Sequence, residues 1–209
     1  CYSIANAYLQ IHMMFGRYIV RDVLSMQAIM KNILLTLMVF GSFEALAECV
    51  DSNYHNCQGA ITYSDGTLYV GEFRDGLPNG QGTFTYGNGK QYEGGLKNGK
   101  PNGQGTFTDG DVMQYVGEFK NGKRNGKGIT YYGSGDVYDG YFENDQREGL
   151  GVFTSQKGHA YEGYWKNGKM TGKGKITFSD GSIYKGDFLD DNAHGLGRIT
   201  YSDGGFYNG

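Results

Sequence analysis

Apolar and polar residues alternate in short stretches from residue 57 to the end of the chain. In residues 69–73 (YVGEF), the two aromatic residues and the glycine lie two positions apart, so they project from one face of a strand and the intervening residues from the other. Residues 82–86 (GTFTY) repeat this alternation. Between the two stretches lies Asp75-Gly76, a dipeptide typical of a two-residue turn between antiparallel strands. The pattern predicts a β-hairpin.

This predicted hairpin recurs with a period of 23 residues. Its first tyrosine is found at positions 69, 92, 115, 138, 161, 184 and 207. We number the full units that begin at the first six of these positions from one to six. A fixed period of this length is typical of an array in which each unit contacts only its neighbours. In unit two, Leu96 replaces the second aromatic residue. The residues expected to form the core of the array are Tyr69, Gly71, Phe73, Tyr92, Gly94, Tyr115, Gly117, Phe119, Tyr138, Gly140, Phe142, Tyr161, Gly163, Trp165, Tyr184, Gly186 and Phe188.

The unit combines the pattern YxGxF with later NGK, GxG and DG sequences, and this combination closely resembles the MORN (membrane occupation and recognition nexus) repeat. The resemblance covers residues 69–206 as six full units, with a half unit at 57–68 and a truncated unit at 207–209. It implies an all-β fold, an elongated single-layer rod of stacked antiparallel β-hairpins without a separate domain core. The hairpin pattern of the residues predicts the same architecture.

The composition is that of a folded chain punctuated by glycine. The 209 residues include 37 Gly but only 2 Pro, which excludes collagen and proline-rich linkers. Aromatic residues make up 15% of the chain, too many for a disordered glycine-rich tail. The formal net charge of -3 provides no strong basic field, so nucleic-acid binding is not expected.

Residues 30–47 have the organisation of a secretory signal peptide. The segment begins with the basic sequence MKN, continues with the apolar run ILLTLMVFGSF and ends with Ala45-x-Ala47, which provides the small residues of a cleavage site. The apolar run is shorter than the roughly 20 residues that a membrane-spanning helix needs. We therefore expect cleavage after Ala47 and a secreted or periplasmic bacterial protein, with residues 1–29 as an upstream extension outside the mature chain.

Two cysteines remain once the signal peptide is removed. Cys49 lies in a predicted N-terminal loop at residues 48–56, and Cys57 begins the array at 57–209. An even pair of cysteines outside the cytoplasm predicts a disulfide. Cys57 stands where unit one has Gly80, so the bond would tie the first strand of the array to the preceding loop.

No unit departs from the repeat pattern with a coherent set of reactive groups. His55, His159 and His194 are scattered, without partners at metal-ligand spacing. The repeated Gly-x-Gly lies inside hairpins, whereas a nucleotide-binding loop has its glycines once, between a strand and a helix. The sequence predicts a protein that is not an enzyme and that binds no cofactor or metal.

Lysine and arginine are concentrated in the loops of units two, three and five, while unit four carries Glu143, Asp145 and Glu148 there. Such loops would line one ridge of the rod as a discontinuous basic stripe. Anionic headgroups are the ligands that a stripe of this kind would bind. Its candidate residues are Lys97, Lys100, Lys120, Lys123, Arg124, Lys127, Lys166, Lys169 and Lys173.

Two functions from different classes are compatible with this pattern. The first, which we favour, is a non-catalytic scaffold that contacts a protein partner or another copy of itself, since the chain combines an extended fold with no reactive site. The second is peripheral binding to anionic membrane lipid or the cell envelope through the basic loops, but the stripe is interrupted and the net charge is negative. An aromatic cage for choline or glycan is a third interpretation, although such cages favour Trp and the chain has only Trp165.

Overall fold

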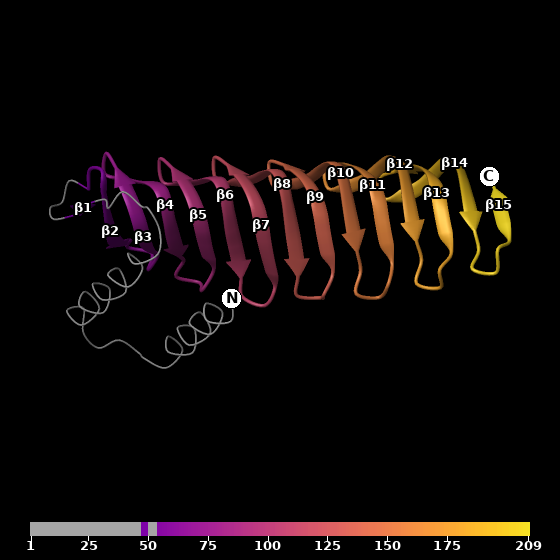
Figure 1. The fold of residues 1–209 in the computed structure, drawn as a ribbon, viewed down its shortest axis with the longest axis horizontal. Helices are drawn as coiled ribbons and strands as arrows, with labels where there is room; N and C mark the ends of the chain where they lie inside the picture. Colours follow the sequence, from indigo (N-terminus) through magenta and orange to yellow (C-terminus); the bar gives the residue numbers. More distant parts are fainter. Residues whose placement is uncertain (1–46, 50–53) are drawn as a thin grey trace, which may run out of the picture. The chain divides into compact units, whose positions relative to one another are not determined.

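The computed structural model describes residues 47–49 and 54–209, and these residues form one open β-sheet. Its strands are β1 (Ala47–Glu48), β2 (Cys57–Thr62), β3 (Leu68–Arg74), β4 (Leu77–Thr85), β5 (Gln91–Lys97), β6 (Lys100–Asp109), β7 (Met113–Lys120), β8 (Lys123–Tyr132), β9 (Val137–Glu143), β10 (Gln146–Thr154), β11 (Ala160–Lys166), β12 (Lys169–Thr177), β13 (Ile183–Leu189), β14 (Asn192–Thr200) and β15 (Phe206–Asn208). They lie in the sheet in the order of the sequence (Figure 1). Strand β1 pairs in parallel with β2, and every later pair is antiparallel. The predicted all-β array of stacked hairpins is confirmed.

Each unit contributes two strands joined by a two-residue turn. In unit three the turn residues Asn121 and Gly122 have φ angles of 53° and 85°, the left-handed geometry that such turns need. Unit four has Asn144 and Asp145 in these positions, also with positive φ, because short polar side chains tolerate this conformation. The second turn residue donates its N–H to the preceding unit, as in Gly122 N to Pro101 O at 2.8 Å. The turns of neighbouring units are therefore stacked along one long edge of the array.

A row of aromatic rings forms the core on one face of the sheet. The first tyrosine of units one to four is fully buried. The ring four positions later stands edge-on to two tyrosines, so that the Phe119 centroid lies 5.0 Å from those of both Tyr92 and Tyr115. Edge-to-face contacts of this kind add to the stabilisation that burial provides, and unit two has the buried Leu96 instead. The same paired contacts are made by Phe142, Trp165 and Phe188.

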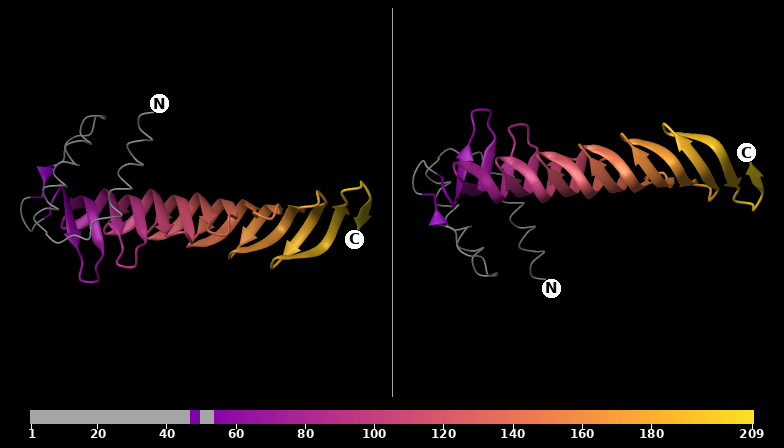
Figure 2. Two further views of the ribbon diagram at one scale, coloured as in Figure 1. Left: turned by 90° about the horizontal axis from the view of Figure 1, so that it is seen from below. Right: turned by 90° about the horizontal axis from the view of Figure 1, so that it is seen from above.

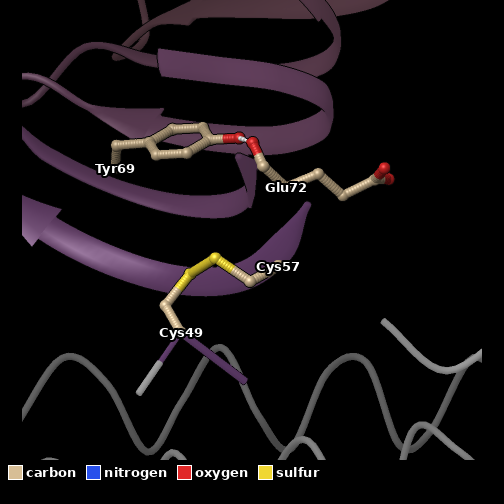
Figure 3. The surroundings of a disulfide bond; sticks show 4 residues. All are labelled: Cys49, Cys57, Tyr69 and Glu72. Atoms are coloured by element: carbon tan, nitrogen blue, oxygen red, sulfur yellow. Dashed lines mark hydrogen bonds between the residues drawn. A yellow bond between two sulfur atoms is a disulfide. The ribbon is translucent and has the colours of Figure 1, made fainter. Parts of the chain in front are cut away.

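Each core tyrosine also bonds to the backbone where the strand pairing is interrupted. In unit one the ladder shifts register between Gly71 and Phe73, and the Tyr69 hydroxyl donates to the Glu72 carbonyl at 2.7 Å (Figure 3). Equivalent bonds recur in units two to six. A bulge of this kind bends a strand. Accordingly, the strands of the hairpins cross in projection when the array is viewed from its long edges (Figure 2).

Burial in this row changes the acidity of the tyrosines. It raises the pKa of Tyr92, Tyr115 and Tyr161 to about 12, because a phenolate is poorly solvated there. Their hydroxyls therefore stay protonated, as hydrogen-bond donors to the bulge carbonyls, even at alkaline pH values at which an exposed tyrosine ionises.

A row of glycines crosses the sheet beneath the tyrosine rings. Gly117 on β7 pairs directly with Gly128 on β8, which in turn pairs with Gly140 on β9. A Cβ atom on Gly117 would lie 2.5 Å from the Cα atom of Gly128, and one on Gly128 would collide with the phenol of Tyr115. Neither Gly117 nor Gly128 has a positive φ. Lack of space, rather than backbone conformation, therefore requires glycine at these positions.

Residues before the array cover the N-terminal end of the aromatic row. A disulfide joins Cys49 and Cys57, whose Cα atoms lie 5.1 Å apart (Figure 3). The Cys49 N–H donates to the Gln58 carbonyl at 2.9 Å, and the Tyr54 ring lies 4.6 Å from that of Phe73. These contacts shield the first full unit on the side that has only a half unit before it, as capping segments do in repeat proteins.

Most of the predicted leader lies outside the described residues. This holds for the predicted upstream extension at 1–29 and for the predicted signal peptide except its last residue. Ala47, after which we expect cleavage, pairs with Cys57 in β1. In the part of the chain that is described, no helix has the length and apolar character needed to cross a bilayer.

We predict that Gly128→Ala destabilises the array, because the new methyl group must displace the Tyr115 ring. Overpacking of this kind should lower the free energy of unfolding by about 1–3 kcal/mol, measured by urea unfolding followed through Trp165 fluorescence. The matched control is Gly168→Asp, since Asp145 and Asp191 already hold the equivalent turn position with positive φ. We expect the control to change stability by less than about 1 kcal/mol. Equal losses in the two variants would contradict the steric argument.

Candidate functional site

Two exposed surfaces of the array carry the candidate groups, and we name them by their place in the sheet. The tip edge is the long edge formed by the turns within units, from Asp75-Gly76 to Asp190-Asp191. The open face is the face of the sheet opposite the aromatic row, where the residues between the core positions project.

The tip edge gathers some of the predicted basic residues. Lys97 pairs with Lys100 across the turn of unit two, and Lys120 pairs with Lys123 across that of unit three. All four are exposed. The two turns are adjacent, because unit three donates a turn N–H to unit two. Like charges placed directly opposite each other repel. These four lysines concentrate positive charge on two adjacent turns and form the positive centre of the tip edge.

The predicted stripe does not continue evenly beyond this cluster. Unit four separates it from Lys166 and Lys169 and has Glu143 opposite Gln146 in the same positions. The Lys169 ammonium also lies 3.4 Å from the Asp190 carboxylate. The structure therefore brings together the lysines of units two and three and leaves those of unit five apart.

Lys127 and Lys173 belong to the open face and not to the tip edge. Each lies between the two glycines of its Gly-x-Gly, near the middle of a strand, and Lys127 pairs across the sheet with Tyr141. Lys173 forms an ion pair with Asp187 at 2.8 Å. The expectation that these residues share one ridge with the turn lysines is therefore wrong, because the register places them several residues from the turns.

Arg124 also differs from expectation, which placed it in a loop away from the aromatic face. It lies opposite Phe119 in the hairpin, so its side chain covers the core, and its guanidinium carbon is 5.0 Å from the ring centroid of Phe142. The same group donates to the Asp145 carbonyl at 2.8 Å. Its side chain is only 22% exposed. Arg124 thus packs on the rings and holds the turn of the next unit.

Arg147 repeats this arrangement one unit later. Its guanidinium carbon lies 3.9 Å from the ring centroid of Trp165, and it donates to the Gly168 carbonyl at 2.7 Å. Units one and two carry Pro78 and Pro101 at the equivalent position. Those prolines are the sequence signal that this position belongs to the packed face.

The open face carries an exposed group of apolar side chains that sequence reasoning missed. Tyr141, Leu150 and Tyr164 are 49%, 53% and 49% exposed, and Leu150 pairs directly with Tyr164. Val116 and Val152, also exposed, lie in the neighbouring row. We call these five residues the apolar strip. They alternate with the core residues, and the sequence signal that could have found them is the difference between units: units one and three have Glu where unit four has Tyr141.

Next to the apolar strip, the open face is hollowed over strands β10 to β14. The hollow has a volume of about 780 Å³ and a floor of glycines, including Gly174 and Gly186. Leu150 and Leu196 line it together with one acidic side chain, that of Glu162, and four basic side chains, those of Lys173, Lys175, Lys185 and Arg198. Lys185 and Arg198 lie in strands rather than loops, which is why a search for basic loops does not find them.

The histidine and acidic side chains of the described residues are spread over the array. Among residues 47–49 and 54–209, no group of three or more His, Cys, Asp and Glu side chains is arranged to hold a metal ion. His55 contacts the Asp75 carboxylate at 2.7 Å, and the His159 ring lies 6.2 Å from that of Phe178. The exposed features of the tip edge and the open face are lysine clusters and apolar side chains, which can contact a ligand through charge and through burial of apolar surface.

Comparison with known proteins places the chain among repeat proteins. The MORN repeat model matches residues 69–91, 92–112, 115–137, 138–160, 161–183 and 184–206. The chain belongs to the MORN repeat family. All six matched MORN repeats begin at a core tyrosine, which confirms the 23-residue register read from the sequence.

Solved structures and curated proteins add the following. The SAS-4 TCP domain of Drosophila melanogaster, in complex with a proline-rich motif of Ana2, is 14% identical over 78% of this chain and 88% of that chain, with a TM-score of 0.38. The wild-type TCP10 domain of Danio rerio CPAP, in complex with a peptide of Danio rerio STIL, is 10% identical over 72% of this chain and 77% of that chain, with a TM-score of 0.33. No curated protein matches the sequence.

The placement of Arg124 predicts that its side chain stabilises the array and that the side chain of its neighbour Lys123 does not. Arg124→Ala removes a guanidinium–ring contact and a hydrogen bond to the turn of the next MORN repeat, so it should lower the free energy of unfolding by about 1–3 kcal/mol. Lys123→Ala removes an exposed tip-edge lysine and should change it by less than about 0.5 kcal/mol. Urea titration of both variants measures the difference. Similar stabilities would show that Arg124 lies free in the loop after all.

Proposed function

We propose that this MORN-repeat chain is a non-catalytic scaffold that binds a protein partner on its open face. The observation that carries the proposal is the apolar strip. Its residues contribute nothing to the aromatic core, which lies on the other face. Three of them, Tyr141, Leu150 and Tyr164, lie on the consecutive strands β9, β10 and β11, and contiguous exposed apolar side chains mark interaction surfaces. Tyrosine is also common at the centres of protein interfaces, where its ring is covered and its hydroxyl is bonded.

The charges beside the apolar strip favour a protein over an anionic membrane. Asp139 and Glu162 are the two cross-strand partners of Val152, and both are exposed. Glu162 pairs with Lys175 at 2.7 Å, and the hollow next to the apolar strip is lined by basic side chains, so charges of both signs lie on this face. A protein surface can place complementary groups against both signs, whereas an anionic membrane complements only one of them.

The tip edge supports a second candidate, peripheral attachment to anionic lipid or to the cell envelope. Four exposed lysines gather on the adjacent turns of units two and three. Each basic residue near an anionic surface contributes about 1 kcal/mol. This candidate is weaker because the lysines of unit five are separated from the cluster by Glu143.

We further propose that the protein is exported and acts in the periplasm or outside the cell, as a bacterial member of the family. The support is the leader sequence that ends at Ala47, together with the Cys49–Cys57 disulfide two residues beyond it, since such bonds persist in oxidising compartments.

Export predicts a mature chain that begins at Glu48 and contains no free thiol. N-terminal sequencing of the secreted or periplasmic protein should return Glu48, and reduction should raise the intact mass by two hydrogens. A chain that retains Met30, or that has two free thiols in the isolated protein, would contradict export.

Site-specific crosslinking tests the scaffold proposal. We expect the photoreactive residue p-benzoylphenylalanine, placed at Tyr141 or Tyr164 in cells that produce the protein, to capture the same discrete protein from both positions. The matched control is Tyr201, which is similarly exposed at 47% but lies outside the apolar strip. Excess unmodified chain should compete with capture. Capture of lipid alone, or equal capture from Tyr201, would count against the proposal.

Vesicle co-sedimentation decides between the two candidates. The wild type and a variant with Lys97, Lys100, Lys120 and Lys123 changed to Glu are compared at low and at physiological salt. The scaffold proposal expects little sedimentation of either chain at either salt concentration, because its partner is a protein. Binding through the lysines would instead fall at physiological salt, where exposed charges are screened over about 8 Å. Tight binding by the wild type that is lost with salt and in the variant would establish the membrane candidate instead.

A further inference from the structure

Three basic residues form a row on the open face at the C-terminal part of the array. Lys175 on β12 pairs with Lys185 on β13, and Lys185 pairs with Arg198 on β14. Like charges directly opposite each other destabilise a sheet. Glu162 offsets Lys175 at 2.7 Å, but no described carboxylate lies within ion-pair distance of Lys185 or Arg198. The row therefore has an unbalanced positive charge.

The repeat fold does not require cations at these positions. Earlier units carry neutral or acidic residues there, so the tyrosine and glycine framework forms equally well without them. The basic row is a local addition to the last two units rather than part of the repeat. The equivalent residues in units one to four are Val70, Thr83, Glu93, Thr106, Val116, Ile129, Asp139 and Val152.

The basic row forms one wall of the hollow, and the opposite wall is partly apolar. Lys175 and Arg198 follow a floor glycine in their strands, while Leu150 and Leu196 precede one. Residues on either side of a glycine project from the same face of a strand, about 7 Å apart. The hollow is therefore a shallow trench that crosses the strands. Lys175, Lys185 and Arg198 lie along one side, where Glu162 pairs with Lys175. Leu150 and Leu196 lie on the other side, with Lys173 between them and paired with Asp187.

The length of the trench suits a short extended chain. It runs from β10 to β14, which is four strand spacings and therefore about 19 Å. An extended peptide covers about 3.3 Å per residue, so roughly six residues would fill it. Side chains of such a peptide alternate between its two sides.

We propose that this trench binds an extended peptide segment of a partner protein in which acidic and apolar residues alternate. The acidic side chains face Lys185 and Arg198, and the apolar side chains cover Leu150 and Leu196. The inference rests on the proposed scaffold function and names the chemistry of its partner. The trench adjoins the apolar strip, because Leu150 belongs to both, so one partner can cover the two surfaces.

The two walls together select a peptide over other anions. Leu150 and Leu196 are 53% and 76% exposed. A sulfated glycan or a lipid headgroup supplies negative charge but no apolar group at the height of the leucines, whereas a peptide supplies both in alternate positions.

Fluorescence anisotropy at physiological salt tests the trench with two labelled synthetic peptides of one composition. The first alternates Asp and Leu over eight residues, and the second has the four Asp and the four Leu in separate blocks. We expect the alternating peptide to bind the full chain about tenfold more tightly than the block peptide. Lys185→Glu and Leu196→Ser should each weaken its binding about tenfold, as expected for losing a charge-assisted contact or an apolar one.

The matched control is Lys123→Glu, which makes the same charge change at an exposed position on the tip edge. It should leave the affinity unchanged within about twofold. Equal binding of the two peptides, or an equal loss in Lys123→Glu, would reduce the effect to general electrostatics and overturn the proposal. Binding of heparin or anionic vesicles that Lys185→Glu abolishes, without binding of the alternating peptide, would also overturn it.

Crosslinking distinguishes a failure of the trench proposal from a failure of the scaffold proposal. If Tyr164 captures a partner protein but the alternating peptide does not bind, the trench proposal is wrong and the scaffold stands. If the peptide binds and neither Tyr141 nor Tyr164 captures a protein, the trench is a peptide site without the wider interface that we propose.

Discussion

A tyrosine ring that lies against two facing glycines is the contact on which the whole array depends. In unit three, Tyr115 can occupy this place only because Gly117 and Gly128 have no side chain. Once there, its hydroxyl reaches the carbonyl at the bulge, and its ring lies perpendicular to that of Phe119. That second ring also touches the tyrosine of the preceding unit. Glycine weakens an isolated strand, but here its absence of bulk lets a large aromatic surface be buried, which more than offsets that cost.

Local pattern was enough to predict the hairpins, their turns and the buried rings, because each is determined within about ten residues. The surfaces were harder to predict, since they depend on the register between strands. Arg124 reads as a loop residue, but the bulge leaves it opposite Phe119 and directs it onto the rings. Lys127 reads as part of the same basic loop, yet it lies beside Tyr141 on the other face. A shift of one residue in the strand register moves a side chain from one face of the sheet to the other.

Stability and binding are divided between the two faces of a single layer. The aromatic face accepts few residue types, because its rings and glycines leave no free space. The open face carries Val, Glu, Lys, Tyr or Leu at equivalent positions of different units without disturbing the hairpins. Differences between units on the open face are therefore where a MORN array can acquire specificity. In this chain the apolar strip and the basic row are two such differences, and they meet at Leu150.

The hydrogen bonds between turns have a consequence for how the chain folds. Each joins a unit to the one before it, as from Gly122 to Pro101, and the aromatic contacts also stop at the neighbouring unit. No such contact in the array has to wait for a distant part of the sequence, so the contact order is low for an all-β protein and folding should be correspondingly fast. Nucleation in any hairpin can spread in both directions, one unit at a time. A whole unit of 23 residues could accordingly be gained or lost without moving any contact elsewhere.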